Sequence, residues 1–206
     1  MQKLTTNEIK FINSYLANSG IIYADIRYEM TDHVATALEE MGGDFYENFR
    51  QYMLEHKKEL LESNRQFAQQ AKREAVNLVF NNFIRTRGLL LLAIMFNIGL
   101  LGTLYTNDQT VRYGYEISST VLFIVCGVFY FRKKMASEKM VWSGTDKLLG
   151  TFMTVLYLLI AILKADRFID TQPVLVLYYS ALNCFIISVL VSYRQLTKKY
   201  NLQFNG

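Results

Sequence analysis

Cysteine, histidine and proline are scarce in this sequence of 206 residues, which contains two cysteines, two histidines and one proline. Cys126 and Cys184 both fall inside apolar stretches, where a thiol usually packs as a small hydrophobic group. A disulfide framework is therefore not predicted. No sequence pattern ties His33 to His56, and no metal site is predicted.

The motifs of several enzyme classes are also missing. The sequence has no G-x-S-x-G, Walker A or G-x-G-x-x-G pattern, so acyl-transfer and nucleotide chemistry have no support. The interiors of its longest apolar stretches carry no Asp, Glu, Lys, Arg or His, apart from Glu116 at one edge. Ion-coupled carriers and proton pumps usually need such groups at membrane depth. We therefore expect a non-enzymatic protein without a catalytic site or cofactor.

Four long apolar stretches are present, at residues 89–105, 115–131, 148–163 and 173–193. The first, as a helix of 17 residues, rises about 26 Å, close to the hydrocarbon thickness of roughly 30 Å. A helix satisfies its own backbone hydrogen bonds there. Short connections make successive helices antiparallel neighbours, which predicts a four-helix transmembrane bundle.

The charges divide the chain into two parts. Residues 1–63 hold eleven Asp or Glu against six Lys or Arg, a net charge of −5, and the remainder holds seven against sixteen, a net charge of +9. Positive charges that flank apolar stretches fit anionic lipid headgroups on the cytoplasmic side. The polar part is acidic, so nucleic-acid binding is not expected.

The distribution of Lys and Arg also predicts the orientation. Twelve of them lie at the end of the polar arm, in the middle loop of the apolar region and in the tail, against only Arg112, Lys164 and Arg167 in the other two loops. The positive-inside rule then places both termini in the cytoplasm of a multi-pass inner-membrane protein.

The polar arm has the spacing of amphipathic helices. Thr5 and Glu8 form a capping-box pattern, and further helices are expected over residues 23–41, from Asp44 and from Asn64, with Gly88 as a plausible hinge before the first span. The sequence therefore predicts an all-α fold: a cytoplasmic acidic helical domain at 1–63, an amphipathic connecting helix at 64–87, and a membrane domain of four spans with a basic tail at 88–206.

The second expected helix carries the candidate site. One side bears an apolar stripe, and the other side bears acidic residues within about two-fifths of the circumference. The candidate partner-binding face comprises Asp25, Glu29, Asp32, His33, Glu39 and Glu40. The alternative is a solvated acidic face, with His33 packing at the edge of the stripe.

The segment around this face resembles a known kind of domain. Glu29, Asp32, His33 and the following Val34 resemble the E-x-x-D-H-hydrophobic pattern of bacterial permease-prefix domains. The same segment is similar to the HTH-associated alpha-helical signalling domain. The resemblance covers about 40 residues, and it implies a small cytoplasmic helical module that regulates or binds a partner.

Two asparagines, Asn97 and Asn183, interrupt the apolar stretches, and we expect them to contribute to polar packing between helices. The leading hypothesis is a regulatory or scaffold subunit that binds an unidentified protein. The rival is a transport or pore-forming subunit that acts as a homo-oligomer, with its path between protomers lined by Asn97, Asn183 and Ser or Thr residues. A third alternative is an enzyme that uses Glu29, Asp32 and His33.

Overall fold

The computed structural model describes residues 3–136, 141–162 and 168–204. The described chain is helical throughout, with 89% helix and no strands. It contains four helices that are long and apolar enough to cross a membrane. The all-α fold is therefore confirmed, together with four helices that are long and apolar enough to cross a membrane. Lys139, Lys164 and Arg167, which belong to the charge count above, lie outside the described residues.

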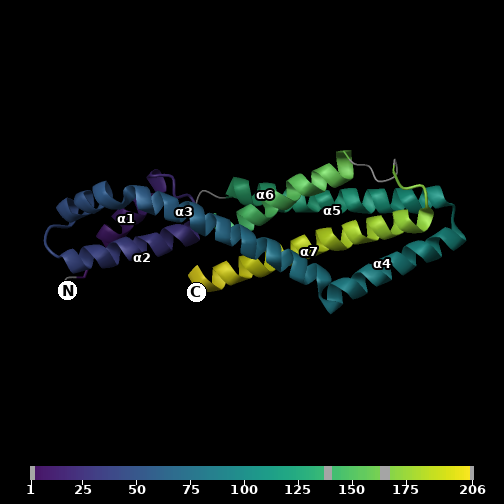
Figure 1. Ribbon diagram of the computed structural model, residues 1–206, viewed down its shortest axis with the longest axis horizontal. Helices are drawn as coiled ribbons and strands as arrows, with labels where there is room; N and C mark the ends of the chain where they lie inside the picture. Colours follow the sequence, from purple (N-terminus) through teal and green to yellow (C-terminus); the bar gives the residue numbers. More distant parts are fainter. Residues whose placement is uncertain (1–2, 137–140, 163–167, 205–206) are drawn as a thin grey trace.

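The N-terminal bundle lies at one end of an elongated molecule (Figure 1). It consists of α1 (Thr6–Asn18), α2 (Ala24–Met41) and the first part of α3 (Phe45–Ile84). The predicted capping box starts α1: the Glu8 amide donates to the Thr5 hydroxyl, and the Thr5 amide donates to the Glu8 carboxylate. These bonds lower the pKa of Glu8. The cap therefore stabilises the fold at neutral pH, and this contribution is lost as the pH falls through the lowered pKa.

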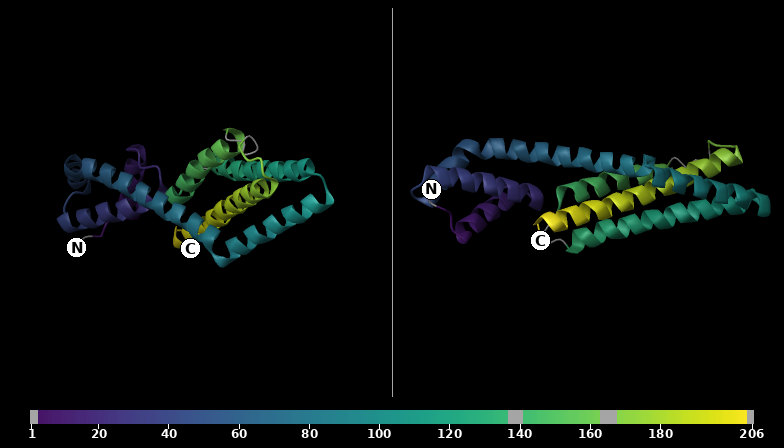
Figure 2. Two further views of the ribbon diagram at one scale, coloured as in Figure 1. Left: turned by 45° about the vertical axis from the view of Figure 1, so that its right-hand side comes forward. Right: turned by 90° about the horizontal axis from the view of Figure 1, so that it is seen from below.

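The expected start of a separate helix at Asn64 is wrong, because α3 runs without interruption through this position for 40 residues. At 1.5 Å per residue it is about 60 Å long. No glycine or proline lies between residues 45 and 84, and the buried stripe continues from Leu60 to Ala75 and Val79. The helix therefore packs in the N-terminal bundle with one half and against the membrane helices with the other (Figure 2).

A sharp bend separates α3 from α4 (Thr86–Tyr105) at Arg85, whose extended backbone has φ −57° and ψ 156°. Gly88 lies inside α4 and is not the hinge itself. A Cβ atom added to Gly88 would lie 2.2 Å from the carbonyl oxygen of Phe83 and 2.5 Å from that of Asn82. Its lack of a side chain thus lets the two helices meet at this angle.

The remaining helices are α5 (Asp108–Ala136), α6 (Ser143–Tyr157), the π-helix η1 (Leu158–Ile162) and α7 (Gln172–Phe204). Their apolar segments coincide with the expected second, third and fourth spans. The last helix extends beyond residue 193, so the basic segment described as a tail is helical to Phe204. Tyr200 and Phe204 stack on Trp142, with centroid separations of 5.3 and 5.2 Å, and Phe204 also stacks on Tyr28 of α2.

Three buried clusters follow one another along the molecule. The first fills the N-terminal bundle, with Ile12, Val34 and Phe49 among its members. The second joins α2, α3, α6 and α7, and the third lies between α5, α6 and α7. Because the second cluster contains Ala24, Val79, Trp142 and Leu196, the N-terminal bundle packs directly against the ends of the membrane helices.

Candidate functional site: the groove between α2 and α3

A groove runs between α2 and α3 on the N-terminal bundle, with a volume of about 570 Å³. Its position follows from the apolar stripe of α2, because burial of Met30, Val34 and Leu38 turns the opposite side of the helix outward. Glu29, Asp32 and His33 are exposed along that side and form one wall. The second wall comes from α3, where His56 and Glu59 face the groove.

The floor of the groove is apolar and well packed. Met30, Tyr52 and Leu60 are buried there, and Phe67 also lines the groove. The ring of Tyr52 lies against that of His56, with centroids 4.5 Å apart. His56 Nδ1 is 3.2 Å from the Glu59 carboxylate, which fixes the imidazole at the rim. Burial raises the pKa of Tyr52, and the nearby charge of Glu59 raises it further. Tyr52 therefore stays neutral at physiological pH.

The groove combines an apolar floor with the carboxylates of Glu29, Asp32 and Glu59. The three carboxylates outnumber the two histidines of the lining, so the groove is acidic. Such a surface attracts a cation that is attached to an apolar group, because the floor accepts the apolar part and the rim accepts the charge.

Sequence reasoning missed the contribution of α3 to this site. His33 and His56 lie in different helices, and only the packing of α2 on α3 brings both into one groove. Hydrophobic periodicity locates a buried stripe, but it does not give the rotation of one helix against another. Over the described part of the chain, no group of three or more His, Cys, Asp or Glu side chains is arranged to hold a metal ion.

The six residues of the predicted face are not used in the same way. Glu29, Asp32 and His33 line the groove, and Glu40 is exposed outside it. Glu39 accepts a hydrogen bond of 2.9 Å from the Leu4 amide and so holds the N-terminal segment. Asp25 is half-buried and lies apart from the groove, where it accepts hydrogen bonds from the amide (3.0 Å) and the hydroxyl of Ser143.

This contact of Asp25 belongs to a junction between α2 and the start of α6. The Ala24 amide donates to the Val141 carbonyl at 2.9 Å, and the Tyr23 hydroxyl donates to Asp146 at 3.0 Å. Burial and the carboxylate of Asp146 raise the pKa of Tyr23, so it remains a hydrogen-bond donor at physiological pH. The junction therefore fixes the groove-bearing helix to the membrane helices.

The two intramembrane asparagines have different surroundings. Asn183 is fully buried, accepts a hydrogen bond from Ser119 (2.7 Å) and donates one to Ser118 (2.8 Å), which links α7 to α5. Asn97 is exposed, and its amide donates to the Ala93 carbonyl of its own helix at 2.8 Å. The expected packing role therefore agrees with the surroundings of Asn183, but Asn97 makes no such contact with the described residues.

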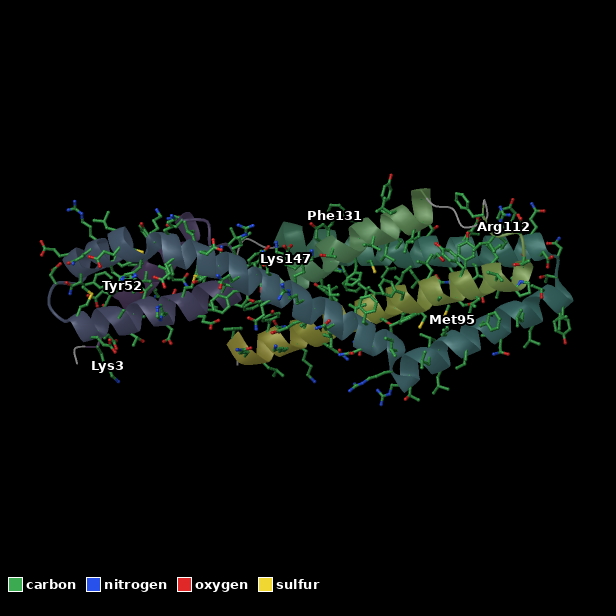
Figure 3. The ribbon with its side chains drawn as sticks, in the orientation of Figure 1. Lys3, Tyr52, Met95, Arg112, Phe131 and Lys147 are labelled. Carbon is green, nitrogen blue, oxygen red and sulfur yellow. The ribbon has the colours of Figure 1, made fainter. Side chains whose placement is uncertain are left out.

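A second polar cluster lies at the far end of the membrane helices, where Figure 3 labels Arg112. Arg112 Nε is 3.3 Å from Glu116, and the Tyr179 hydroxyl donates to the same carboxylate at 3.4 Å. The charge of Glu116 is thus paired beside a small cavity of about 320 Å³.

Fold and site together define a helical protein with four candidate membrane spans and an acidic groove on its N-terminal bundle. No known protein family, curated protein or solved structure matches the chain.

Proposed function

We propose that this chain is a non-enzymatic regulatory or scaffold subunit of the inner membrane, whose N-terminal bundle binds a protein partner through the α2–α3 groove. Both termini lie in the cytoplasm in this proposal, and the bundle stands next to anionic headgroups. The main support for this proposal is the groove, in which three carboxylates and an apolar floor occur together. The resemblance of Glu29, Asp32 and His33 to permease-prefix domains supports the same function.

The partner offers a short segment in which Lys or Arg residues flank one or two apolar side chains. A volume of about 570 Å³ falls within the range of pockets that bind ligands or a few side chains. The buried Met30, Tyr52 and Leu60 provide contact for the apolar anchor. The carboxylates at the rim add specificity and speed association more than they add affinity.

The fixed junction between α2 and α6 supports a regulatory function. Binding at the groove acts on α2, whose first turn is bonded to Val141, Ser143 and Asp146 at the start of a membrane helix. A partner can therefore influence the membrane part through a continuous set of contacts.

The rival function, a pore between protomers, receives less support. The two asparagines of its path do not share one surface, because Asn97 is exposed on α4 and Asn183 is fully buried between α5 and α7. A homo-oligomer with ion flux is nevertheless an outcome that the following experiment separates from partner docking.

A photo-crosslinking amino acid at Thr36, which is exposed and lines the groove, tests the proposal in cells. We expect an adduct with a different protein, joined through a basic segment that peptide mapping identifies. The variant Glu29→Gln/Asp32→Gln/Glu59→Gln should lose the adduct, because the complementary charge is removed. The control Glu40→Gln/Glu55→Gln/Glu62→Gln removes the same charge from exposed positions outside the groove and should retain it.

Two results would contradict the proposal. An adduct that survives in the groove variant as well as in the control shows that the carboxylates do not recognise the partner. An adduct formed only with a second copy of this chain, together with ion flux in liposomes, favours the pore.

A further inference from the structure

A second large cavity lies where the N-terminal bundle meets the membrane helices, with a volume of about 690 Å³. Arg65 and Lys72 of α3 line it on one side, and Tyr130 of α5 and Lys147 of α6 on the other. Figure 3 shows Lys147 at this meeting point, between the N-terminal bundle and the membrane helices. The cavity is separate from the α2–α3 groove and shares no residue with it.

The charge of this cavity is positive. It contains three cations, Arg65, Lys72 and Lys147, and only one carboxylate, Asp146. That carboxylate already accepts a hydrogen bond from the Tyr23 hydroxyl. None of the three cations forms an ion pair with a residue that the structure describes. Lys147 instead lies over the Tyr23 ring, with Nζ 5.4 Å from the centroid. Three cations against one carboxylate leave the lining with a net positive charge, which favours an anionic ligand.

The place of the cavity along the molecule restricts the source of this ligand. Tyr130 lies near the end of the second candidate span, which ends at Arg132. Gly150 and Thr151 lie two turns into the third candidate span, which begins at Ser143. The cavity therefore opens at the level of the lipid headgroups on the side predicted to be cytoplasmic.

We propose that this cavity binds the phosphate headgroup of an anionic phospholipid. Arg65, Lys72 and Lys147 hold the phosphate. The bound lipid joins α3 to α5 and α6, and so strengthens the contact between the N-terminal bundle and the membrane helices. This inference rests on the four membrane spans and is independent of partner binding at the α2–α3 groove.

Native mass spectrometry of the purified full-length chain in detergent tests the proposal. The lipids are phosphatidylglycerol and phosphatidylcholine, and soluble glycerol 3-phosphate is the competitor. We expect one retained phosphatidylglycerol per chain, bound at least about tenfold more tightly than phosphatidylcholine. Glycerol 3-phosphate at the same concentration should not displace it, because it lacks the acyl chains.

Variants assign the binding to the cavity. Arg65→Gln/Lys72→Gln/Lys147→Gln should weaken phosphatidylglycerol binding about tenfold or more. The control Arg85→Gln/Lys198→Gln/Lys199→Gln removes the same charges near the membrane but outside the cavity, and it should bind like the wild type. Circular dichroism verifies that each variant is folded.

Three results would overturn the proposal. If the cavity variant and its control lose phosphatidylglycerol binding equally, the lipid is attracted non-selectively by the positive charges near the membrane. If phosphatidylcholine is retained as well as phosphatidylglycerol, the anionic headgroup does not determine binding. Displacement of the lipid by glycerol 3-phosphate at equal concentration assigns the site to a free phosphate compound. The groove experiment is unaffected by any of these results, so failures of the two proposals can be told apart.

Discussion

At the scale of single residues, Asp25 has the most direct structural role among the acidic residues of α2. Its carboxylate accepts hydrogen bonds from the amide and the hydroxyl of Ser143, the first residue of α6. The first amides of a helix have no partner within the helix, so a carboxylate from another element acts as a cap. Trp142, the residue at the cap position, makes no such bond with its side chain.

We expect Asp25→Ala to destabilise the protein by about 1–2 kcal/mol, the usual effect of losing a helix cap. Glu29→Ala is the matched control, because Glu29 is exposed on the same helix and should change stability by less than about 0.5 kcal/mol. Reversible denaturant unfolding in detergent, followed by circular dichroism, measures both. Equal stability of the two variants would show that the contact between Asp25 and Ser143 does not hold the junction.

The same residue shows what the sequence can and cannot predict about the site. Helical periodicity distinguishes the buried Met30 and Val34 from the exposed Glu29 and Asp32, but it leaves His33 at the edge of the apolar stripe, and the structure shows it exposed. Periodicity could not distinguish Asp25 from Glu29, because the contact with Ser143 spans 118 positions of the chain. The contributions of Tyr52, His56 and Glu59 to the groove depend on tertiary packing in the same way.

At the scale of elements, the bend between α3 and α4 decides how the N-terminal bundle is connected to the first span. Gly88 allows close approach at this bend, since a Cβ atom there would lie 2.2 Å from the carbonyl oxygen of Phe83. Cys184 of α7 donates to the Gly88 carbonyl at 3.2 Å, which ties the same turn to the last span. The atoms nearest to an added Cβ are backbone atoms of Phe83 and Asn82, so the clash cannot be relieved by rotating a neighbouring side chain.

We expect Gly88→Ala to lower stability by about 1–3 kcal/mol, as overpacking usually does. The control is Gly114→Ala in α5, where a Cβ atom meets nothing within 4 Å. That change should be neutral or stabilise by up to about 1 kcal/mol, because alanine favours helix more than glycine does. Thermal unfolding in detergent compares the two variants, and a Gly88→Ala protein as stable as the control would exclude a tight bend.

The sequence predicted the existence of most elements but not all of their ends. Four apolar stretches gave the four candidate spans, and the glycines at 42 and 43 correctly ended α2. The start expected at Asn64 was wrong because a long surface helix needs no break when its apolar stripe continues onto a second partner. The helical extension of α7 to Phe204 depends on stacking with Trp142, a contact that local sequence patterns do not reveal.

At the scale of the whole molecule, two helices join the N-terminal bundle to the membrane helices. In Figure 1, α3 runs from the bundle towards the start of α4, and the C-terminal end of α7 lies next to the bundle. The Asn82 amide donates to Ser192 (2.8 Å) and Gln195 (3.0 Å), which fastens α3 to α7. The groove, the junction and the positive cavity therefore belong to one continuous structure, and they lie at the end of the membrane helices that is opposite Arg112.

We propose that the chain crosses a membrane four times, with its N-terminal bundle and the end of α7 on the same side. Single-cysteine labelling of spheroplasts with an impermeant maleimide tests it most directly, in a background where Cys126→Ala and Cys184→Ala remove the two buried thiols. The positions are exposed: Asp108→Cys and Asp170→Cys at one end, Leu54→Cys and Leu202→Cys at the other. We predict labelling at 108 and 170 in intact spheroplasts, and at 54 and 202 only after lysis. Labelling of 54 or 202 in intact spheroplasts, or protection of 108, would contradict the account.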